Sequence, residues 1–211
     1  MDLAQLRRDY SSAPLLESEV KSDPVEQFGL WFNQALEAGI VDPNAMTLAT
    51  ATPEGQPSAR VVLLKKYDEA GFCFFTNYQS PKAQDLAANP RAALMYYWHD
   101  LFRQVRIGGQ VVKTSKDASQ QYFAARPRGA QLATWVSKQG QVVESRGELD
   151  RLFAEYDKKF DQEVPLPDYW GGYRLIPDTF EFWQGRENRL HDRLRYRKQE
   201  DGSWVIERLA P

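Results

Sequence analysis

Short segments with a two-residue period, separated by polar turns, make up most of this chain from residue 45 onward. Residues 45–52, 58–67 and 72–76 have the pattern of three strands, with turns at 53–57 and 68–71 between them. These turns are too short for the crossover that joins parallel strands, so we expect an antiparallel meander. The same pattern predicts further strands at residues 91–98, 102–114, 170–176, 179–184, 189–197 and 203–209.

Helices are expected around these strands. Asp23 and Pro24 are typical of a helix start, and apolar side chains then recur at helical spacing until Gly39. Other helices are expected at residues 81–89, 115–125, 129–136 and 147–160. The inner side of the last one is expected to carry Leu149, Leu152, Phe153, Tyr156 and Phe160. The pattern as a whole predicts an α+β protein with an antiparallel β-barrel core and flanking helices.

The sequence predicts one domain preceded by an arm. Residues 1–22 contain few large apolar side chains and no clear period, which favours a mobile N-terminal arm. Residues 23–211 contain no internal repeat and no low-complexity run, so they are interpreted as a single domain.

The composition excludes several classes of protein. A net charge of -2 does not favour nucleic-acid binding. With Cys73 as the single cysteine and only 2 histidines, a disulfide and a clustered metal site are both excluded. No run of about 18 apolar residues is present, and the first ten residues lack the apolar core of a signal peptide. We therefore expect a soluble cytoplasmic protein with no membrane or nucleic-acid partner.

Arg189, His191 and Arg193 alternate with Leu190 and Asp192 near the C-terminal end. In an extended strand the three basic side chains would share one face. Two guanidinium groups around an imidazole favour an anionic, planar ligand. A charged strand at the edge of a sheet, with its side chains in solvent, accounts for the same pattern without a ligand.

Other basic side chains lie at positions that suit phosphate groups. Arg60 and Lys65 would point to opposite faces of one strand, because their separation is odd. Either they serve different ligands, or a bulge or a bend at the strand end brings them together. Lys82 lies near an expected helix N-terminus, where a cation is unfavourable unless an anion is bound. Tyr122 and Arg126 share a helix face, although compensation of the helix dipole also accounts for this arginine.

The sequence contains no familiar nucleotide or nucleophile motif. It lacks a Gly-x-Gly-x-x-Gly turn after a strand, a P-loop and a Gly-x-Ser-x-Gly elbow. Gln104, among strand hydrophobics, suits hydrogen bonding to the edge of a heterocycle, and a surface glutamine fits equally well. Such a set of residues indicates that a cofactor carries the chemistry while the protein orients it.

Several motifs together resemble the pyridoxamine/pyridoxine 5′-phosphate oxidase family. They are Arg60-Val-Val-Leu-Leu-Lys65, Phe75-Thr76-Asn77, Tyr122-Phe-Ala-Ala-Arg126-Pro127, Trp170-Gly171-Gly172, Phe182-Trp183-Gln184-Gly185, Arg189-Leu190-His191-Asp192-Arg193 and the terminal Arg208-Leu209-Ala210-Pro211. The resemblance implies an FMN-binding split β-barrel that works as a homodimer, with FMN between the subunits. It also implies oxidation of pyridoxamine or pyridoxine 5′-phosphate to pyridoxal 5′-phosphate, with O₂ reduced to H₂O₂.

The resemblance also implies roles for particular residues. The FMN site would contain Arg60, Lys65, Phe75, Thr76, Lys82, Gln104, Gln139, Gly140, Trp183 and Arg193. The substrate site would contain Arg7, Arg8, Tyr10, Lys65, Tyr122, Arg126, Ala130, Arg189, Leu190 and His191. Arg189 and His191 would be the catalytic residues, next to the substrate ring and its reacting side.

The sequence departs from the family at three positions. Pro81 stands where an arginine commonly precedes the lysine, Ala130 where a serine often reaches the substrate phosphate, and Gly140 where a serine follows the glutamine. Weaker or rearranged anion contacts are expected there. Two alternatives stay open: a related flavin-barrel reductase with another substrate, and a carrier of FMN or pyridoxal phosphate without catalysis.

Overall fold

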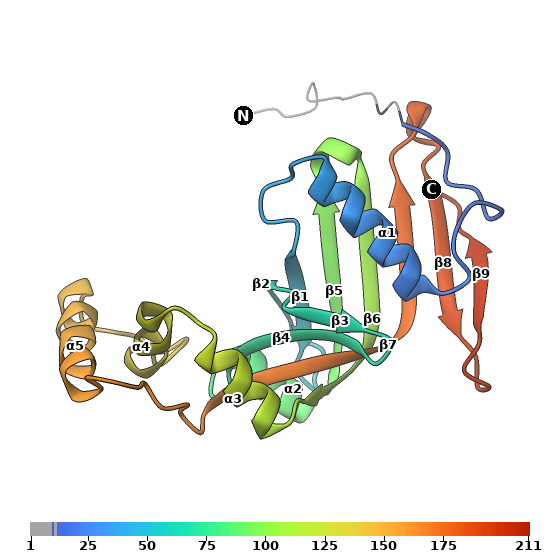
Figure 1. Ribbon diagram of the computed structural model, residues 1–211. Coiled ribbons are helices and arrows are strands. Elements are labelled where there is room, and N and C mark those ends of the chain that lie inside the picture. The colour runs from blue at the N-terminus through green and yellow to red at the C-terminus, as the bar shows by residue number, and fades with distance from the viewer. Residues whose placement is uncertain (1–9, 11) are drawn as a thin grey trace.

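The computed structural model, shown in Figure 1, describes residue 10 and residues 12–211. Its helices are α1 (Pro24–Glu37), α2 (Pro81–Ala88), α3 (Lys116–Ala124), α4 (Arg128–Val136) and α5 (Arg146–Lys159), with 3-10 turns at His99–Leu101 and Glu187–Arg189. Its strands are β1 (Ala45–Ala51), β2 (Pro57–Leu63), β3 (Lys66–Asp68), β4 (Gly71–Asn77), β5 (Arg91–Trp98), β6 (Arg103–Lys113), β7 (Trp170–Gln184), β8 (Asp192–Lys198) and β9 (Trp204–Arg208).

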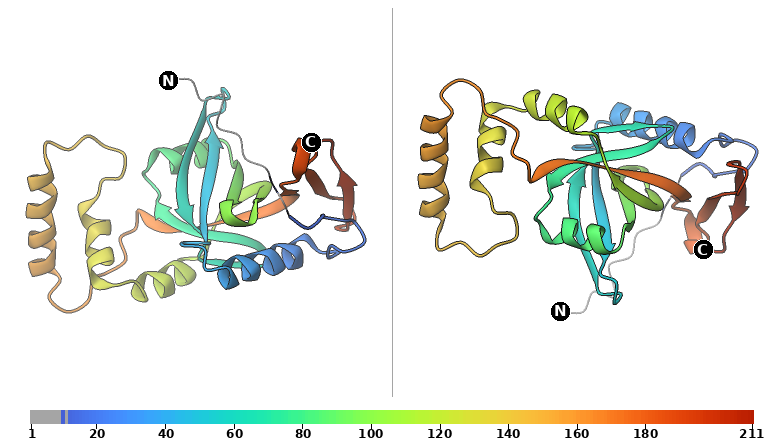
Figure 2. Two further views of the ribbon diagram at one scale, coloured as in Figure 1. Left: turned by 90° about the horizontal axis from the view of Figure 1, so that it is seen from above. Right: turned by 90° about the horizontal axis from the view of Figure 1, so that it is seen from below.

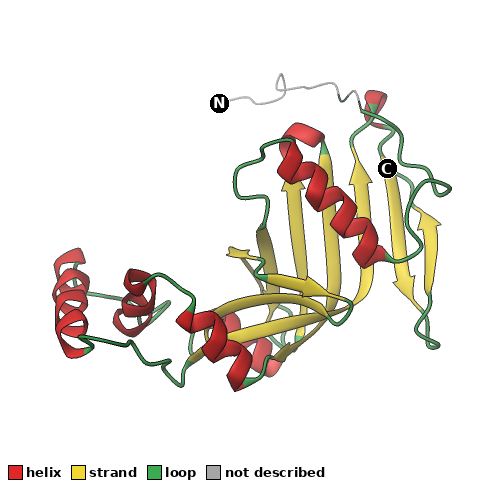
Figure 3. Cartoon of the chain, in the orientation of Figure 1, coloured by secondary structure: helices red, strands yellow, loops and turns green. Residues whose placement is uncertain are grey.

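All the strands belong to one curled antiparallel sheet in the order β2-β1-β5-β6-β7-β4-β3, with β8 and β9 added beside β7. Figure 3 shows that helices lie around this sheet and not between its strands. The expected α+β split barrel with flanking helices is confirmed.

The expected three-strand meander is wrong, because the chain forms two separate hairpins. β1 pairs with β2 and β5, whereas β4 pairs with β3 and β7. The predicted strand 58–67 is interrupted at Leu64 and Lys65, where the backbone leaves β1 and reaches β4. There the Lys65 N–H donates to the Cys73 carbonyl at 2.9 Å. The chain therefore bends between the two halves of the sheet instead of continuing straight.

β7 is one long bent strand, although the sequence predicted two. Its pairing with β6 shifts between Gly108 and Gly109, so Asp178 has no partner in the β6–β7 register. A bulge of this kind bends a strand and increases its twist. A Cβ atom at Gly109 would lie 2.1 Å from the Ile176 carbonyl oxygen, so the bend requires a glycine there. The bend lets β7 pair with β4 at one end and with β8 at the other.

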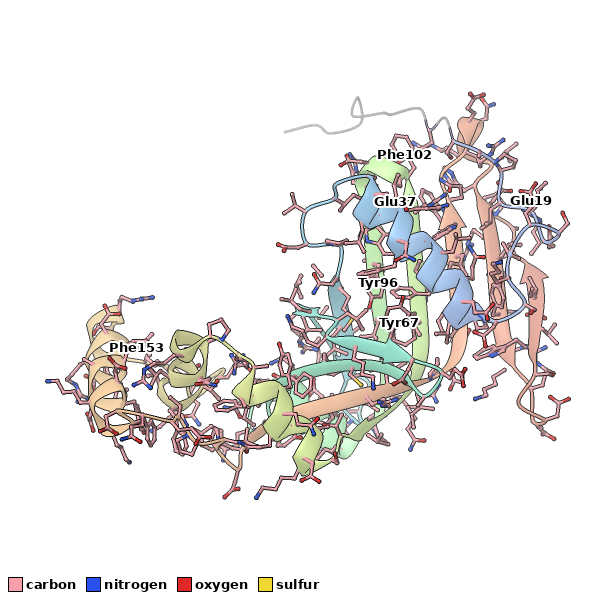
Figure 4. All side chains as sticks on the ribbon, in the orientation of Figure 1. Glu19, Glu37, Tyr67, Tyr96, Phe102 and Phe153 are labelled. Atoms are coloured by element: carbon pink, nitrogen blue, oxygen red, sulfur yellow. The ribbon has the colours of Figure 1, made fainter. Side chains whose placement is uncertain are left out.

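The main core lies between the sheet and α1, which crosses its face in Figure 1. Asp23 caps this helix by accepting from the Val25 N–H at 2.6 Å, as the sequence predicted. Phe28 packs at 5.0 Å from the Tyr96 ring and 5.1 Å from the Tyr67 ring. Figure 4 labels these two tyrosines next to α1.

α4 and α5 lie side by side at one end of the molecule, away from α1 in both views of Figure 2. They pack through Trp135 of α4 and Tyr156 of α5, whose rings lie 5.9 Å apart. The predicted inner side of α5 is only half covered, and Phe153 (labelled in Figure 4) is 38% exposed. Within the described residues, no helix is long and apolar enough to cross a membrane.

Residues 12–22, which belong to the expected arm, lie beside β8 and β9 (Figure 1). We call residues 12–17 the N-terminal strap. Leu15 is buried, its N–H donates to Asp192 at 3.1 Å, and Glu17 pairs with Arg208 at 2.7 Å. These contacts connect the beginning of the described chain to its last two strands.

Candidate functional site

A cavity of about 880 Å³ opens between β2, β4 and the helices α2, α3 and α4. Many of the predicted ligand-binding residues line it, namely Arg60, Lys65, Phe75, Thr76, Lys82, Tyr122, Arg126, Ala130, Gln139 and Gly140. Among the residues that the structure describes, no aspartate or glutamate lines this cavity, although 4 lysine and arginine side chains do. This charge balance favours an anionic ligand.

Lys82 is the most enclosed cation of the cavity, with 8% of its surface exposed. Its Nζ donates to Gln139 Oε1 at 2.8 Å and to the hydroxyls of Thr76 and Ser80, both at 3.2 Å. These acceptors are neutral. Burial, followed by the charge of Arg60, lowers the pKa of Lys82 from 10.5 to about 8. A bound phosphate would supply the missing negative charge.

The bend at Leu64 and Lys65 accounts for the position of two predicted residues. In an unbroken strand Arg60 and Lys65 would point to opposite faces, yet both line the same cavity. Arg60 donates to the Leu48 carbonyl at 3.1 Å and lies 3.8 Å from Asp85. The bend between β2 and β3, one of the possibilities that the sequence left open, brings both residues to one cavity.

Stacked aromatic rings form one wall of the cavity. Phe75 and Tyr122 stack at 4.0 Å, and Trp170 lies nearly parallel to Tyr122 at 6.1 Å. The Arg126 guanidinium lies 4.6 Å above the Trp170 ring and donates to the Thr134 hydroxyl at 2.7 Å. Burial lowers the pKa of Arg126. Cations beside flat rings suit a ligand that combines a phosphate with a ring.

The other predicted residues that the structure describes lie at a second place, in or beside the turn between β7 and β8. Arg189, His191 and Arg193 do not share a strand face as expected, because β8 begins at Asp192. Asn188 and Arg189 have φ angles of 55° and 60°, in the left-handed region that an extended strand does not use. The two catalytic candidates therefore lie on a tight turn, where Arg189 is exposed.

His191 lies in an aromatic cluster on this turn. Its ring is 4.7 Å from Trp183 and 5.4 Å from Tyr10, and Tyr10 is 5.9 Å from Trp183. The backbone N–H of Arg186 donates to His191 Nδ1 at 3.0 Å, which leaves Nε2 to carry the proton of the neutral ring. Burial, followed by the charge of Arg189, lowers the pKa of His191. Both effects favour the neutral imidazole.

Gln104 and Arg193 flank this cluster, because each lies directly opposite Trp183 on a neighbouring strand. Arg193 is already paired in the described chain: its Nε donates to Glu181 Oε1 at 3.0 Å, and its Nη1 donates to the Ala210 carbonyl at 2.8 Å. Leu190 is 69% exposed. Arg7 and Arg8 lie outside the described residues.

Sequence reasoning missed three residues that shape these places. Trp170 stacks in the cavity wall, Thr134 holds Arg126, and Arg186 fixes the His191 ring. The Trp-Gly-Gly motif was a usable signal for Trp170. No local pattern marks Thr134 or Arg186, because their partners are defined only by the folded chain.

The fold and the cavity define a split-barrel protein whose cavity lining suits anionic, flat ligands. A family model described as pyridoxamine 5′-phosphate oxidase matches residues 32–160, and one described as the pyridoxine 5′-phosphate oxidase C-terminal dimerisation region matches residues 170–211. The chain belongs to the pyridoxine/pyridoxamine 5′-phosphate oxidase family and is a flavin-dependent oxidoreductase.

Similar proteins match along almost the whole chain. The pyridoxine/pyridoxamine 5′-phosphate oxidase of Rubrobacter xylanophilus is 55% identical, covering 100% of this chain and 97% of that protein. The protein of the same name from Cupriavidus pinatubonensis is 54% identical, covering 99% of each. Among solved structures, PhzG from Burkholderia lata 383, in complex with tetrahydrophenazine-1-carboxylic acid, matches with a TM-score of 0.89 and 30% identity, covering 95% of this chain and 100% of that one.

Proposed function

We propose that the chain oxidises pyridoxamine 5′-phosphate and pyridoxine 5′-phosphate to pyridoxal 5′-phosphate, using FMN and O₂ and releasing H₂O₂. The names of the full-length relatives support this substrate class. The observation that carries the proposal is the cavity, where 4 cations and stacked aromatic rings meet without a carboxylate in the described lining. That combination suits ligands made of a phosphate monoester and a flat ring.

FMN fits the inner part of this cavity. Lys82 is a buried cation whose described contacts are all neutral oxygens, so a phosphate there would be its counter-ion. We assign Arg60, Thr76, Lys82 and Gln139 to the FMN phosphate and the chain that carries it. When bound, FMN supplies a two-electron acceptor that O₂ can reoxidise.

The substrate phosphate suits the outer part of the cavity. Lys65 has its ammonium 6.0 Å from the Tyr122 ring, and Arg126 is fixed by Thr134 on the neighbouring helix. We assign these two cations and the Tyr122 hydroxyl to that phosphate. Ala130 has no hydroxyl group to donate to the phosphate. The two cations therefore supply more of the anion binding than they would if residue 130 were a serine.

Arg189 and His191 are assigned to the substrate ring. Oxidation of the alcohol removes a hydride from carbon and a proton from oxygen and gives the aldehyde. Oxidation of the amine removes a hydride from carbon and a proton from nitrogen and gives an imine, which water hydrolyses to the aldehyde and ammonia. Since His191 Nδ1 accepts from the Arg186 N–H, its Nε2–H is the group available to donate to a ring oxygen. Arg189, exposed and cationic, is placed to orient the ring. Neither role requires His191 to change charge.

The cavity and the aromatic cluster lie on different parts of one chain, so we propose that a homodimer joins them. Residues 170–211, which match a dimerisation region, contain the whole β7–β8 turn. In this arrangement one protomer supplies the cavity and its partner supplies the cluster. We also propose that residues 1–22 form an N-terminal arm and that residues 23–211 form a single domain.

An absorption spectrum of the purified protein tests this function. We expect bound flavin, and anaerobic addition of pyridoxine 5′-phosphate should bleach it. Flavin that binds but is not bleached would point to the carrier or to a reductase with another substrate. Arg189→Ala and His191→Ala should retain FMN and lose most turnover, and near-normal turnover in either variant would contradict the catalytic assignment.

A further inference from the structure

Arg208, the last residue of β9, connects the C-terminal hairpin of β8 and β9 to residues near the other end of the chain. Its Nε donates to Glu17 Oε1 at 2.8 Å, and its Nη2 donates to Glu17 Oε2 at 2.7 Å and to the Leu15 carbonyl at 2.8 Å. Its Nη1 donates to Asp192 Oδ1 at 2.7 Å. A single guanidinium thus holds the N-terminal strap and the first residue of β8 together.

Asp192 passes this connection to the β7–β8 turn. Its second carboxylate oxygen accepts from the Leu15 N–H at 3.1 Å and lies 3.5 Å from Arg186 Nε. Arg186 in turn donates its backbone N–H to His191 Nδ1 at 3.0 Å, and its guanidinium donates to the Ser12 carbonyl. The network therefore runs from the C-terminal strand to the imidazole through groups in direct contact.

The strap also reaches His191 by a second route. The Ser12 hydroxyl donates to the Gly185 carbonyl and accepts from Gln184 Nε2 at 3.0 Å. Two residues earlier, the Tyr10 ring lies against His191 and Trp183. A strap fixed at Leu15 and Glu17 thus limits where Tyr10 can go.

We propose that Arg208 is a positioning residue: it fixes the strap and the β7–β8 turn to each other, and so sets the orientation and enclosure of His191. The consequence for turnover rests on the proposed function. Arginine is suited to this task because its planar fork can satisfy several acceptors in fixed directions at once. A lysine ammonium at the same place could not satisfy both carboxylates and the Leu15 carbonyl with the same geometry.

Arg195 provides a matched control. It lies on β8, pairs with Glu207 of β9 at 2.8 Å, and has a side chain 41% exposed, against 38% for Arg208. Its pair stabilises the same two strands, but no described contact connects it to the strap or to the turn. Comparing Arg208→Gln with Arg195→Gln therefore separates positioning of His191 from general stability of β8 and β9.

The readout is the pKa of His191, measured by NMR titration of the imidazole protons. The chain has 2 histidines, so His191→Gln assigns the signals and His99 serves as an internal reference. The groups around the His191 ring are Tyr10, Trp183, the Arg186 N–H and Arg189. Arg208→Gln should loosen this shell and raise the His191 pKa toward about 6.5, the value of a solvated imidazole. Arg195→Gln should leave it unchanged.

Turnover gives a second readout. Arg208→Gln should lower kcat by up to about 100-fold, the effect of a misplaced group near the chemistry, with FMN affinity unchanged. If Arg208→Gln does not fold, Glu17→Gln weakens the same network at one partner and should shift the His191 pKa in the same direction. An unshifted His191 pKa, or the same shift in Arg195→Gln, would overturn the proposal. If the unmodified protein oxidises no phosphorylated B6 substrate, the proposed function fails while the titration still decides the role of Arg208.

Discussion

Lys82 shows how one buried side chain connects sequence, burial and binding. The sequence places it at a helix start that disfavours cations, and the fold then encloses it among neutral oxygens. Burial, followed by the charge of Arg60, destabilises the charged form, which is why the pKa of Lys82 falls to about 8. Such a cation is tolerable in a site whose function is to hold an anion.

A pH dependence of FMN binding follows. Bound phosphate should raise the pKa of Lys82 above its value of about 8 in the free protein. Between the two values the complex holds more protons than the free protein, so affinity should fall as pH rises above about 8. Fluorescence titrations of FMN from about pH 7 to about pH 9 measure this. In Lys82→Arg the guanidinium stays charged, and the fall should disappear; a constant affinity in the unmodified protein would contradict the prediction.

Two departures from the family, Pro81 and Gly140, contact each other in the structure. A Cβ atom at residue 140 would lie 2.5 Å from Cδ of Pro81, and Gly140 has a φ angle of 90°. A serine at 140 would therefore meet the proline ring as well as an unfavourable backbone conformation. Gly140 leaves the space that the Pro81 ring occupies, so the two departures from the family fit together.

Gly140→Ser should consequently lower the free energy of unfolding by more than Gly55→Ser. Gly55 has a similar φ angle of 88° with no atom within 4 Å of an added Cβ, so it isolates the backbone cost of about 1–2 kcal/mol. Pro81→Ala should recover part of the loss in Gly140→Ser and none in Gly55→Ser. Denaturant unfolding of the single and double variants measures the coupling; equal losses at the two glycines would exclude the contact.

At the scale of elements, the bend of β7 determines how the sheet is arranged. One continuous strand pairs with β4 near its start and with β8 near its end, and the bulge opposite Gly108 and Gly109 makes this possible. The cavity wall and the aromatic cluster thus depend on the same strand, through Trp170 at its beginning and Trp183 close to its end.

Gly109→Ala should therefore destabilise the protein strongly. The new methyl group would lie 2.1 Å from a backbone carbonyl oxygen that cannot move without breaking the β6–β7 pairing, so we expect a loss of about 3 kcal/mol. Gly129→Ala is the control, since Gly129 lies in α4 with nothing within 4 Å and alanine favours helix there. Thermal unfolding should show a large fall for the first variant and none for the second; similar melting temperatures would refute the role of the bulge.

At the scale of the whole molecule, the separation of cavity and cluster makes a prediction about assembly. If the homodimer joins the cavity of one protomer to the cluster of its partner, Lys82→Met and His191→Gln damage different halves of each site. A heterodimer of the two variants would keep one intact site. Co-expression of both should then restore about one quarter of normal oxidase activity, because half of the dimers are mixed and each has one good site.

Two variants that damage the same half provide the control. Lys82→Met mixed with Arg126→Gln should stay inactive, because every cavity in these dimers carries one of the two substitutions. Recovery in that control, or no recovery in the first mixture while the protein is dimeric by sedimentation, would contradict a site shared between protomers.

The local sequence determined most of the helices and strands. Asp23 and Pro24 begin α1, two-residue periods mark the strands, and short polar turns make them antiparallel, because each of these signals acts between residues close in the chain. Resemblance in short motifs also identified a set of cations, aromatic residues and glutamines, and many of these line one cavity.

Only the tertiary structure decided which strands pair and how the basic residues group. Pairing of β1 with β5 and β4 with β7 depends on contacts between distant segments, which no local period encodes. The bend at Leu64 and Lys65 follows from that pairing, and it places Arg60 and Lys65 in one cavity. The turn that ends at His191 is not extended, because Asn188 and Arg189 have left-handed φ angles. Asp192 and Arg208 join the start of β8 to the strap, and these partners meet only when the two ends of the described chain come together.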